Sequence, residues 1–166
     1  MNRRHFFFRL FALSLVPALP AIAKERSALM PLRKTKSEWK ALLPGERFRI
    51  LFEEDTERPF TSALNNEKRS GTYICAACSL PLVDAAHKFD SGTGWPSFWD
   101  VLPGAVATRR DFRLVWPRTE YHCARCGGHQ GHVFKDGPAP TGLRYCNNGL
   151  ALKFVPAGET LPALVT

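Results

Sequence analysis

The spacing of apolar residues predicts two short helices near the start of the chain. From Ser37 to Leu43 the apolar positions recur at helical spacing, with Ser37 as the candidate N-cap, and Pro44-Gly45 ends the segment. A second short helix is expected from Glu46 to Glu53. The helical part of the chain is therefore confined to its first third.

From residue 71 onward the pattern changes to short runs rich in β-branched and aromatic residues, separated by turn residues. The expected strands cover residues 72–74, 106–108, 112–116, 119–122, 143–146 and 150–155. The 13 prolines and 12 glycines, spread along the chain, also favour short strands over long helices. We therefore expect a mainly β fold of antiparallel sheets, packed as a sandwich or a partly open barrel.

Length and charge limit the number of domains and the kinds of partner that the protein can have. The chain has 166 residues, 45 % of them hydrophobic, which is enough for a single core. Its net charge is +8, and the first 23 residues supply three arginines and no acid, so about +5 remains without them. No basic cluster alternates with aromatics, so we expect a solvated basic surface. Nucleic-acid binding remains an alternative, which predicts strongly salt-dependent binding.

Residues 1–23 have the pattern of an export signal. A basic start with Arg3-Arg4 precedes an apolar stretch from Leu10 to Ala21, and Ala21-Ile22-Ala23 fits a cleavage site. The paired arginines resemble a twin-arginine signal, whose route carries folded proteins, so a bacterial periplasmic location is expected. A membrane anchor is the alternative, although the apolar stretch is short and interrupted by two prolines. Residues 24–36 then form a linker, and 37–160 form one domain.

The five cysteines fall into two CxxC pairs and one single residue. The pairs are Cys75 with Cys78 and Cys123 with Cys126, and two such loops can close a tetrahedral four-thiolate metal site. One structural zinc ion is the predicted occupant, and iron is the alternative metal. Redox-active CxxC motifs are a further alternative, although no βαβ pattern surrounds the pairs. A protein that binds zinc and folds before export would carry these thiols as metal-bound thiolates rather than as disulfides.

The single cysteine, Cys146, is a candidate nucleophile. In an extended strand, Arg144, Cys146 and Asn148 share one face, and a guanidinium beside a thiol favours the thiolate. His129 and His132 precede this segment and could supply an imidazole for proton transfer. The alternatives are an inert buried cysteine and histidines that bind the metal.

An aromatic loop offers a possible binding wall. Residues 89–99 place Trp95, Phe98 and Trp99 in a glycine-rich turn, where an aromatic surface can hold a small apolar group. The alternative is that these rings belong to the core.

Taken together, these motifs resemble the peptide-methionine (R)-S-oxide reductases, the type B methionine sulfoxide reductases. The resemblance spans about residues 35–155 and rests on long strings, which are SEWKALL, TERPFTS, GTYICAAC, KFDSGTGWPSFW, CARCGGHQGHVF, DGPAPTGLRYCNN and LKF. It implies a two-sheet β fold like that of the zinc-binding Mss4 group. It also implies an oxidoreductase that reduces the R epimer of methionine sulfoxide in proteins and peptides, which is a repair function under oxidative stress.

The resemblance also implies roles for single residues. Cys146 is the expected nucleophile, and His132, assisted by His129, is expected to protonate the sulfoxide oxygen. Trp95 is expected to hold the substrate's methyl group. The other implied site residues are Phe98 for substrate contact, Asp136, Arg144 and Asn148 for the polar side of the pocket, and Cys75, Cys78, Cys123 and Cys126 as zinc ligands.

One departure from the family pattern bears on the reaction. Many members carry a second, resolving cysteine where this chain has Thr93. We therefore expect the oxidised Cys146 to be reduced by an external partner, a thioredoxin-like dithiol protein or a small thiol. Asn147, in a position that is usually aliphatic, is a smaller departure. The protein is expected to be a monomer without stable membrane insertion. A non-catalytic zinc module that binds a protein partner is the alternative on this fold.

Overall fold

Two short helices begin the part of the chain that the computed structural model describes, residues 30–113 and 116–166. Helix α1 covers Lys36–Leu42 and helix α2 covers Gly45–Glu53, so both expected helices are confirmed. The expected N-cap was wrong. Thr35, not Ser37, caps α1, because its hydroxyl accepts the Glu38 N–H while the Glu38 carboxylate accepts the Thr35 N–H.

The strands form two antiparallel sheets, as expected from the sequence. The smaller sheet has the order β2-β1-β9 and the larger has the order β3-β4-β8-β7-β6-β5. The strands of the smaller sheet are β1 Gly71–Cys75, β2 Pro81–Asp84 and β9 Leu152–Pro156. Those of the larger are β3 Lys88–Phe89, β4 Ser97–Phe98, β5 Val106–Asp111, β6 Arg118–Cys123, β7 His129–Phe134 and β8 Arg144–Asn147.

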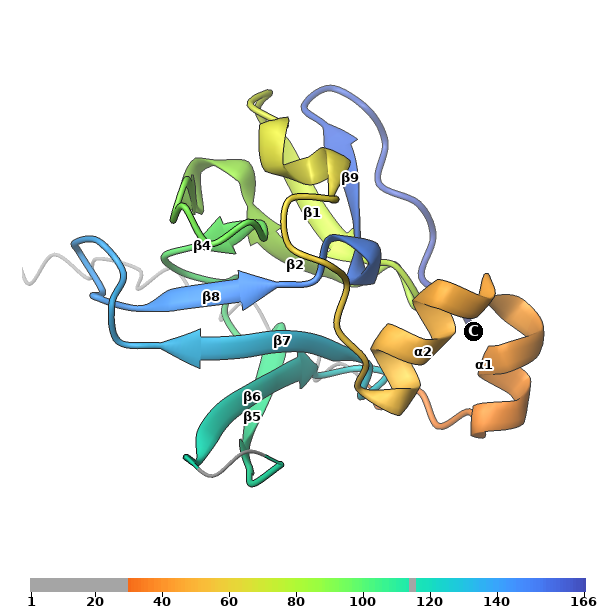
Figure 1. Ribbon diagram of the computed structural model, residues 1–166. Helices are drawn as coiled ribbons and strands as arrows, with labels where there is room; N and C mark the ends of the chain where they lie inside the picture. Colours follow the sequence, from red (N-terminus) through yellow and green to blue (C-terminus); the bar gives the residue numbers. More distant parts are fainter. Residues whose placement is uncertain (1–29, 114–115) are drawn as a thin grey trace, which may run out of the picture.

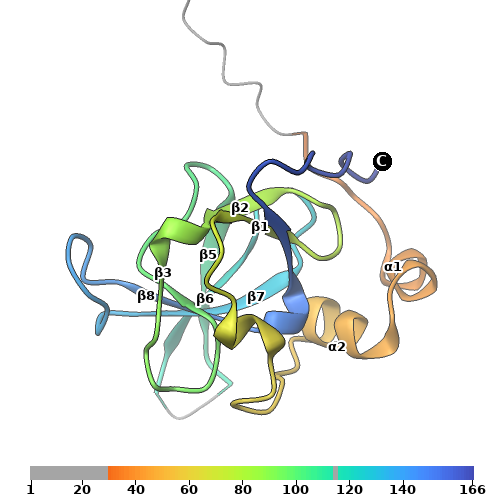
Figure 2. The same ribbon diagram turned by 90° about the horizontal axis from the view of Figure 1, so that it is seen from above.

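Figure 1 shows the smaller sheet above the larger one, with α1 and α2 together at one end. Seen from above, α1 and α2 again lie together at one end, with β9 beside α2 (Figure 2). The core fills the space between these layers. Tyr73 of β1 meets Phe98 of β4 edge to face at 4.9 Å between ring centres, and Trp39 of α1 is also buried. Hydrophobic contact between the sheets thus holds the larger sheet in place from one side.

The predicted strand over 112–116 was wrong. Strand β5 ends at Asp111, and Phe112, Arg113 and Trp116 lie outside any strand, while 114 and 115 are outside the described residues. The cause is local, because the Asp111 carboxylate accepts the Arg113 N–H at 2.8 Å and turns the chain out of the ladder. Trp116 is 81 % exposed.

Three single-turn 3₁₀ helices complete the fold, and they are η1 Ala63–Asn66, η2 Ala85–His87 and η3 Gly149–Ala151. The last replaces the beginning of the strand expected over 150–155. The predicted signal over 1–23 and most of the linker lie outside the described residues, and residues 30–35 belong to no helix or strand. Within the described ranges, no helix combines the length and the apolar character needed to cross a membrane.

Gly131 controls the spacing between β7 and β8. It pairs with Asn147, and a Cβ atom on Gly131 would lie 1.9 Å from the carbonyl oxygen of Cys146. We therefore expect Gly131→Ala to lower the free energy of unfolding by about 1–3 kcal/mol, because the strands must separate. Denaturant-induced unfolding measures this change.

The matched control is Gly45→Ala at the start of α2, where a new Cβ meets no atom within 4 Å. This variant should be neutral or more stable, because alanine favours helix. Equal stability of Gly131→Ala and the unmodified protein would contradict the proposed close approach of the two strands.

Candidate active site

The register of the larger sheet gathers a row of polar side chains on one face. Cys146 of β8 lies directly opposite His132 of β7 on one side and Ser97 of β4 on the other. Next in the row, His132 is opposite Glu120 of β6, and Glu120 is opposite Arg109 of β5. Directly opposed residues of an antiparallel pair project from the same face and lie within contact distance. The strands thus bring together a thiol and an imidazole that are 14 positions apart in the chain.

Cys146 opens into a small cavity of about 120 Å³. The residues that line it are Thr56, Trp95, Arg118, Gly131, His132, Phe134, Cys146 and Asn148. Its lining combines two aromatic rings, those of Trp95 and Phe134, with the thiol of Cys146, the imidazole of His132 and the amide of Asn148. The cavity therefore has the size for the end of one side chain and offers it both apolar and polar contacts.

Trp95 reaches this cavity because its loop is packed against the segment that follows α2. The indole Nε1 donates to the carbonyl oxygen of Glu57 at 3.1 Å. Gly94 has φ +90°, and a Cβ there would lie 2.8 Å from the Phe60 backbone, so glycine is required at this close approach. Of the three rings in the expected aromatic wall, Trp95 therefore lines the pocket.

The other two rings of this loop do not reach the cavity. Phe98 is fully buried and packs on Tyr73 in the core, which leaves no part of it exposed to a ligand. Its expected substrate contact is not reproduced in this arrangement, because Phe98 lies on the face of β4 that covers the core. Trp99 instead packs against His87, with 4.1 Å between ring centres.

Cys146 lies between opposing influences on its pKa. Burial raises the pKa of the Cys146 thiol, while the Arg144 guanidinium and a hydrogen bond from Thr93 act in the opposite direction. Burial, which the sequence analysis considered only in the alternative of an inert cysteine, has the largest effect. The pKa of the thiol is therefore raised overall, which favours the protonated thiol, and Arg144 and Thr93 counteract part of this shift.

Asp136 acts on the pocket through Arg144. Its carboxylate accepts two hydrogen bonds from Arg144, from Nε and Nη2, each at 2.9 Å. The Arg144 guanidinium also lies over the Phe134 ring at 4.3 Å. Asp136 itself is mostly exposed and does not line the cavity. It thus orients the guanidinium beside Cys146.

His132 is held by a carboxylate that the sequence analysis did not identify. Its Nε2 lies 2.8 Å from Oδ2 of Asp111, which also accepts a 2.6 Å hydrogen bond from Arg118. Burial lowers the pKa of His132, and the hydrogen bond with Asp111 partly restores it. Asp111 therefore fixes the orientation of the His132 ring and counteracts the lowering of its pKa by burial.

His129 lies behind His132 and is almost completely buried. Its Nδ1 is 2.7 Å from Oε1 of Glu120, and the two imidazole rings are 5.4 Å apart between centres. Glu120 is buried too, yet the hydrogen bond with His129, the nearby His122 imidazole and the charge of Arg109 hold the pKa of its carboxyl well below the usual range. His129 is thus a buried support of the site rather than part of the cavity wall.

Asn148 lines the cavity with both ends of its amide engaged. Its Oδ1 accepts the Glu57 N–H at 3.1 Å, and its Nδ2 donates to the Gln130 carbonyl at 3.2 Å. The side chain therefore joins the Glu57 segment, β7 and the end of β8 around the pocket.

Sequence reasoning missed Asp111, Arg118 and Glu120, together with Thr56 and Phe134 of the cavity wall. One signal was present for Glu120, a charged residue within the strand expected over 119–122, whereas Arg118 stands just before that expected strand. Their partners could not be found in this way, because these depend on the register of β5, β6 and β7.

The four paired cysteines form a separate cluster, away from Cys146. Their Sγ atoms lie within 4.8 Å of one another, with 3.5 Å between Cys78 and Cys123 and 3.6 Å between Cys75 and Cys126. Four thiolates around zinc at about 2.3 Å require sulfur separations of about 3.8 Å. The donor set and its spacing thus fit a tetrahedral metal ion.

The loops around this cluster also fit a metal site. The residue after each CxxC pair, Ser79 or Gly127, has a left-handed backbone, at φ 63° and 72°. The Gly128 N–H and the Gln130 amide point at sulfur atoms of Cys126 and Cys75, at 3.4 and 3.8 Å. Such donors stabilise thiolates that bind a metal.

This combination of a β scaffold, a tetrathiolate cluster and an isolated thiol beside an imidazole is that of a thiol-dependent oxidoreductase. A family model, the SelR domain, matches residues 43–156. The chain is 50 % identical over 129 residues to a peptide methionine sulfoxide reductase MsrB of Pseudomonas putida, covering 77 % of this chain and 97 % of that protein. It is 52 % identical over 124 residues to an MsrB of Thiobacillus denitrificans, covering 74 % and 94 %. The chain belongs to the MsrB family of peptide methionine sulfoxide reductases.

The hydrogen bond between Asp111 and His132 can be tested by titration. In Asp111→Asn the pKa of His132 should fall below its value in the unmodified protein, because the carboxylate no longer stabilises the imidazolium and Arg118 loses its counter-charge. NMR titration of the histidine ring signals measures the shift.

Glu53→Gln, which removes an exposed acid of α2 away from the cavity, is the control and should leave the His132 titration in place. An unchanged or higher His132 pKa in Asp111→Asn would contradict the assignment of this pair.

Proposed function

We propose that the protein reduces methionine-R-sulfoxide in proteins and peptides to methionine, with Cys146 as the reacting thiol. The observation that carries this proposal is the placement of Cys146 directly opposite His132, in a small cavity with an aromatic wall. The relatives, at about 50 % identity, are named as peptide methionine sulfoxide reductases, which supports the reaction class. A non-catalytic zinc module is not favoured.

The reaction transfers the sulfoxide oxygen to Cys146. The Cys146 thiol gives its proton to His132, and the thiolate attacks the sulfoxide sulfur, which forms a sulfur–sulfur bond. His132 delivers the proton to the sulfoxide oxygen. The protonated oxygen then moves to the Cys146 sulfur, while its bond to the substrate sulfur and the sulfur–sulfur bond both break. Methionine leaves with two more electrons than the sulfoxide had. Cys146 has lost those two electrons and ends as a sulfenic acid that carries the oxygen and its proton.

The surrounding residues prepare both groups for this step. Arg144, held by Asp136, offsets the effect of burial on the thiol, and Asp111 keeps His132 able to hold a proton in spite of burial. Trp95 covers the apolar side, where the methyl group of the substrate fits. A methyl group and an oxygen exchange places between the two epimers at sulfur, so a pocket with one apolar and one polar side distinguishes them.

The sulfenic acid must be reduced from outside the chain. The sequence has five cysteines, and four of them form the cluster. Thr93, which stands where many relatives carry a resolving cysteine, offers only a hydroxyl to the thiol. An external dithiol protein or a pair of small thiols therefore completes the cycle, yielding the free Cys146 thiol, a disulfide and water.

Zinc is the metal that we propose for the Cys75, Cys78, Cys123 and Cys126 cluster. Four thiolates without an open position favour a structural zinc ion. The ion would neutralise the buried thiolates and join the two sheets, without a part in the reaction.

Export through residues 1–23 is also part of this proposal, and it rests on the sequence pattern of that segment alone. In the bacterial periplasm its substrates would be exported proteins that carry oxidised methionine. The enzyme is proposed to act as a monomer.

Turnover of the separated sulfoxide epimers tests the proposed function. With a thiol reductant, the protein should convert a peptide containing methionine-R-sulfoxide and leave the S epimer unchanged. Cys146→Ser should lose at least about a thousandfold in kcat/KM, because a hydroxyl cannot replace the thiolate. Chromatographic separation of methionine from both epimers measures the reaction.

Thermal unfolding of Cys146→Ser provides the control that the fold is intact. Conversion of the R epimer by Cys146→Ser at the rate of the unmodified protein would refute the assigned nucleophile. Equal conversion of both epimers would refute the assigned pocket.

A further inference from the structure

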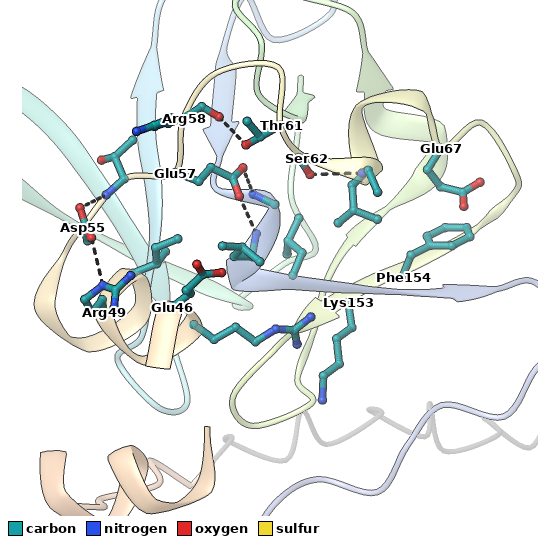
Figure 3. Close-up of a pocket in the computed structure, with 18 of the residues that line it drawn as sticks. Glu46, Arg49, Asp55, Glu57, Arg58, Thr61, Ser62, Glu67, Lys153 and Phe154 are labelled. Atoms are coloured by element: carbon teal, nitrogen blue, oxygen red, sulfur yellow. Dashed lines mark hydrogen bonds and ion pairs between the residues drawn. The ribbon is translucent and has the colours of Figure 1, made fainter. Parts of the chain in front are cut away.

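A second and much larger cavity, of about 1010 Å³, lies beside the pocket of Cys146. Helix α2, residues 55–64, η3 and the start of β9 surround it, and we call it the α2–β9 groove (Figure 3). Thr56 lines both this groove and the pocket of Cys146. The two hollows are therefore neighbours that share one wall.

Glu57 forms the connection between them. On the groove side its carboxylate accepts the backbone N–H groups of Gly149 and Leu150, the latter at 3.0 Å, as Figure 3 shows. On the pocket side its own N–H donates to Asn148, and its carbonyl holds the Trp95 indole. An occupant of the groove therefore rests on the same segment that positions the aromatic wall of the pocket.

The charges of the groove leave an excess of cations for a partner. Two pairs are satisfied internally, Arg49 with Asp55 at 3.6 Å and Arg69 with Glu67 at 2.6 Å.

Three cations remain. Among the described residues, no acidic oxygen lies within 4.0 Å of the charged nitrogens of Arg47, Arg58 or Lys153. Glu46 is the one acid of the groove lining that has neither an ion pair nor a backbone anchor in the described part of the chain. With five cations against four acids, Glu57 included, the groove lining has a formal net charge of +1, and its cations without an ion pair outnumber its acids without one.

The remaining lining of the groove is apolar. Its apolar residues are Ile50, Ala63, Leu64, Leu150, Leu152 and Phe154. A concave surface with an apolar floor and a cationic edge suits an extended chain that carries both apolar and acidic side chains.

The catalytic pocket is so small that a peptide substrate must extend beyond it. Its 120 Å³ holds the end of one methionine sulfoxide side chain, so the polypeptide on either side of that residue must lie outside it. The groove, which begins at Thr56, is the adjoining hollow with room for several residues.

We propose that the α2–β9 groove binds the acidic polypeptide segment that flanks a methionine sulfoxide held at Cys146. This inference rests on the proposed function and adds a substrate preference to it. Methionine-R-sulfoxide near aspartate and glutamate is the favoured substrate, because Arg47, Arg58 and Lys153 pair with these side chains.

Three synthetic peptides test the proposal, each with one methionine-R-sulfoxide flanked on both sides by acidic, neutral or basic residues. We expect kcat/KM for the acidic peptide to exceed that for the neutral peptide by roughly three- to tenfold at low salt, the effect of two or three exposed ion pairs. The ratio should approach one at high ionic strength. In Arg47→Glu/Lys153→Glu the ratio should fall below one.

The matched control is Lys36→Glu/Lys40→Glu, which makes the same change in net charge on α1, outside the groove. It should keep the preference of the unmodified protein, which separates the groove from the overall basic charge.

Two outcomes would overturn the proposal. The first is a ratio near one in the unmodified protein, and the second is an unchanged ratio in Arg47→Glu/Lys153→Glu. If that variant also had a raised KM for a dithiol reductant protein, the groove would be a reductant site. In both outcomes the neutral peptide is still turned over, so the proposed function stands, whereas its failure would show as no turnover of any peptide by the unmodified protein.

Discussion

The pairing of β7 with β8 is the constraint on which the site depends. It sets His132 opposite Cys146, and it is possible at this spacing because Gly131 has no side chain to meet the carbonyl of Cys146. The same sheet also supplies a carboxylate partner for each imidazole, since β5 brings Asp111 to His132 and β6 brings Glu120 to His129. A shift of one residue in this register would turn the thiol or the imidazole to the other face. Reactivity is therefore a property of the sheet rather than of any one motif.

The tetrathiolate cluster supports this arrangement from the other end of the sheets. Cys75 ends β1 in the smaller sheet and Cys123 ends β6 in the larger, so a metal held by both joins the two layers. The cluster also limits the chemistry. Because it engages four of the five cysteines, the oxidised Cys146 has no free partner in its own chain.

Local patterns in the sequence predicted the parts of the structure that depend on neighbouring residues. Helical spacing and Pro44-Gly45 located α1 and α2, and the two CxxC motifs located the cluster in spite of 44 residues between them. Side chains that compete for backbone groups produced the errors, since Thr35 displaced Ser37 as the cap and Asp111 ended β5 before the expected strand.

Contacts that depend on register were not predictable from residue spacing alone. The sequence order offered an imidazole near Cys146 as one of several alternatives, and the resemblance to a family implied His132 in that role. The carboxylate partners of the two histidines were not found at all. Asp111 lies 21 residues before His132, and nothing in the intervening sequence indicates that they meet. Phe98 was expected at the pocket with Trp95, but alternation along β4 turns it into the core. The α2–β9 groove combines residues between 46 and 69 with residues 149–154, which are far apart in the chain, and left no local signal.

Native mass spectrometry after a single turnover tests the central claim, that Cys146 alone reacts while the other four cysteines hold a metal. The protein is mixed with one equivalent of a methionine-R-sulfoxide peptide, without reductant. The account predicts one bound zinc ion and one added oxygen, about 16 Da, on the fragment that contains Cys146. A loss of two hydrogens with a disulfide between Cys146 and a cysteine of the cluster, or oxidation at the cluster with Cys146 unchanged, would contradict it.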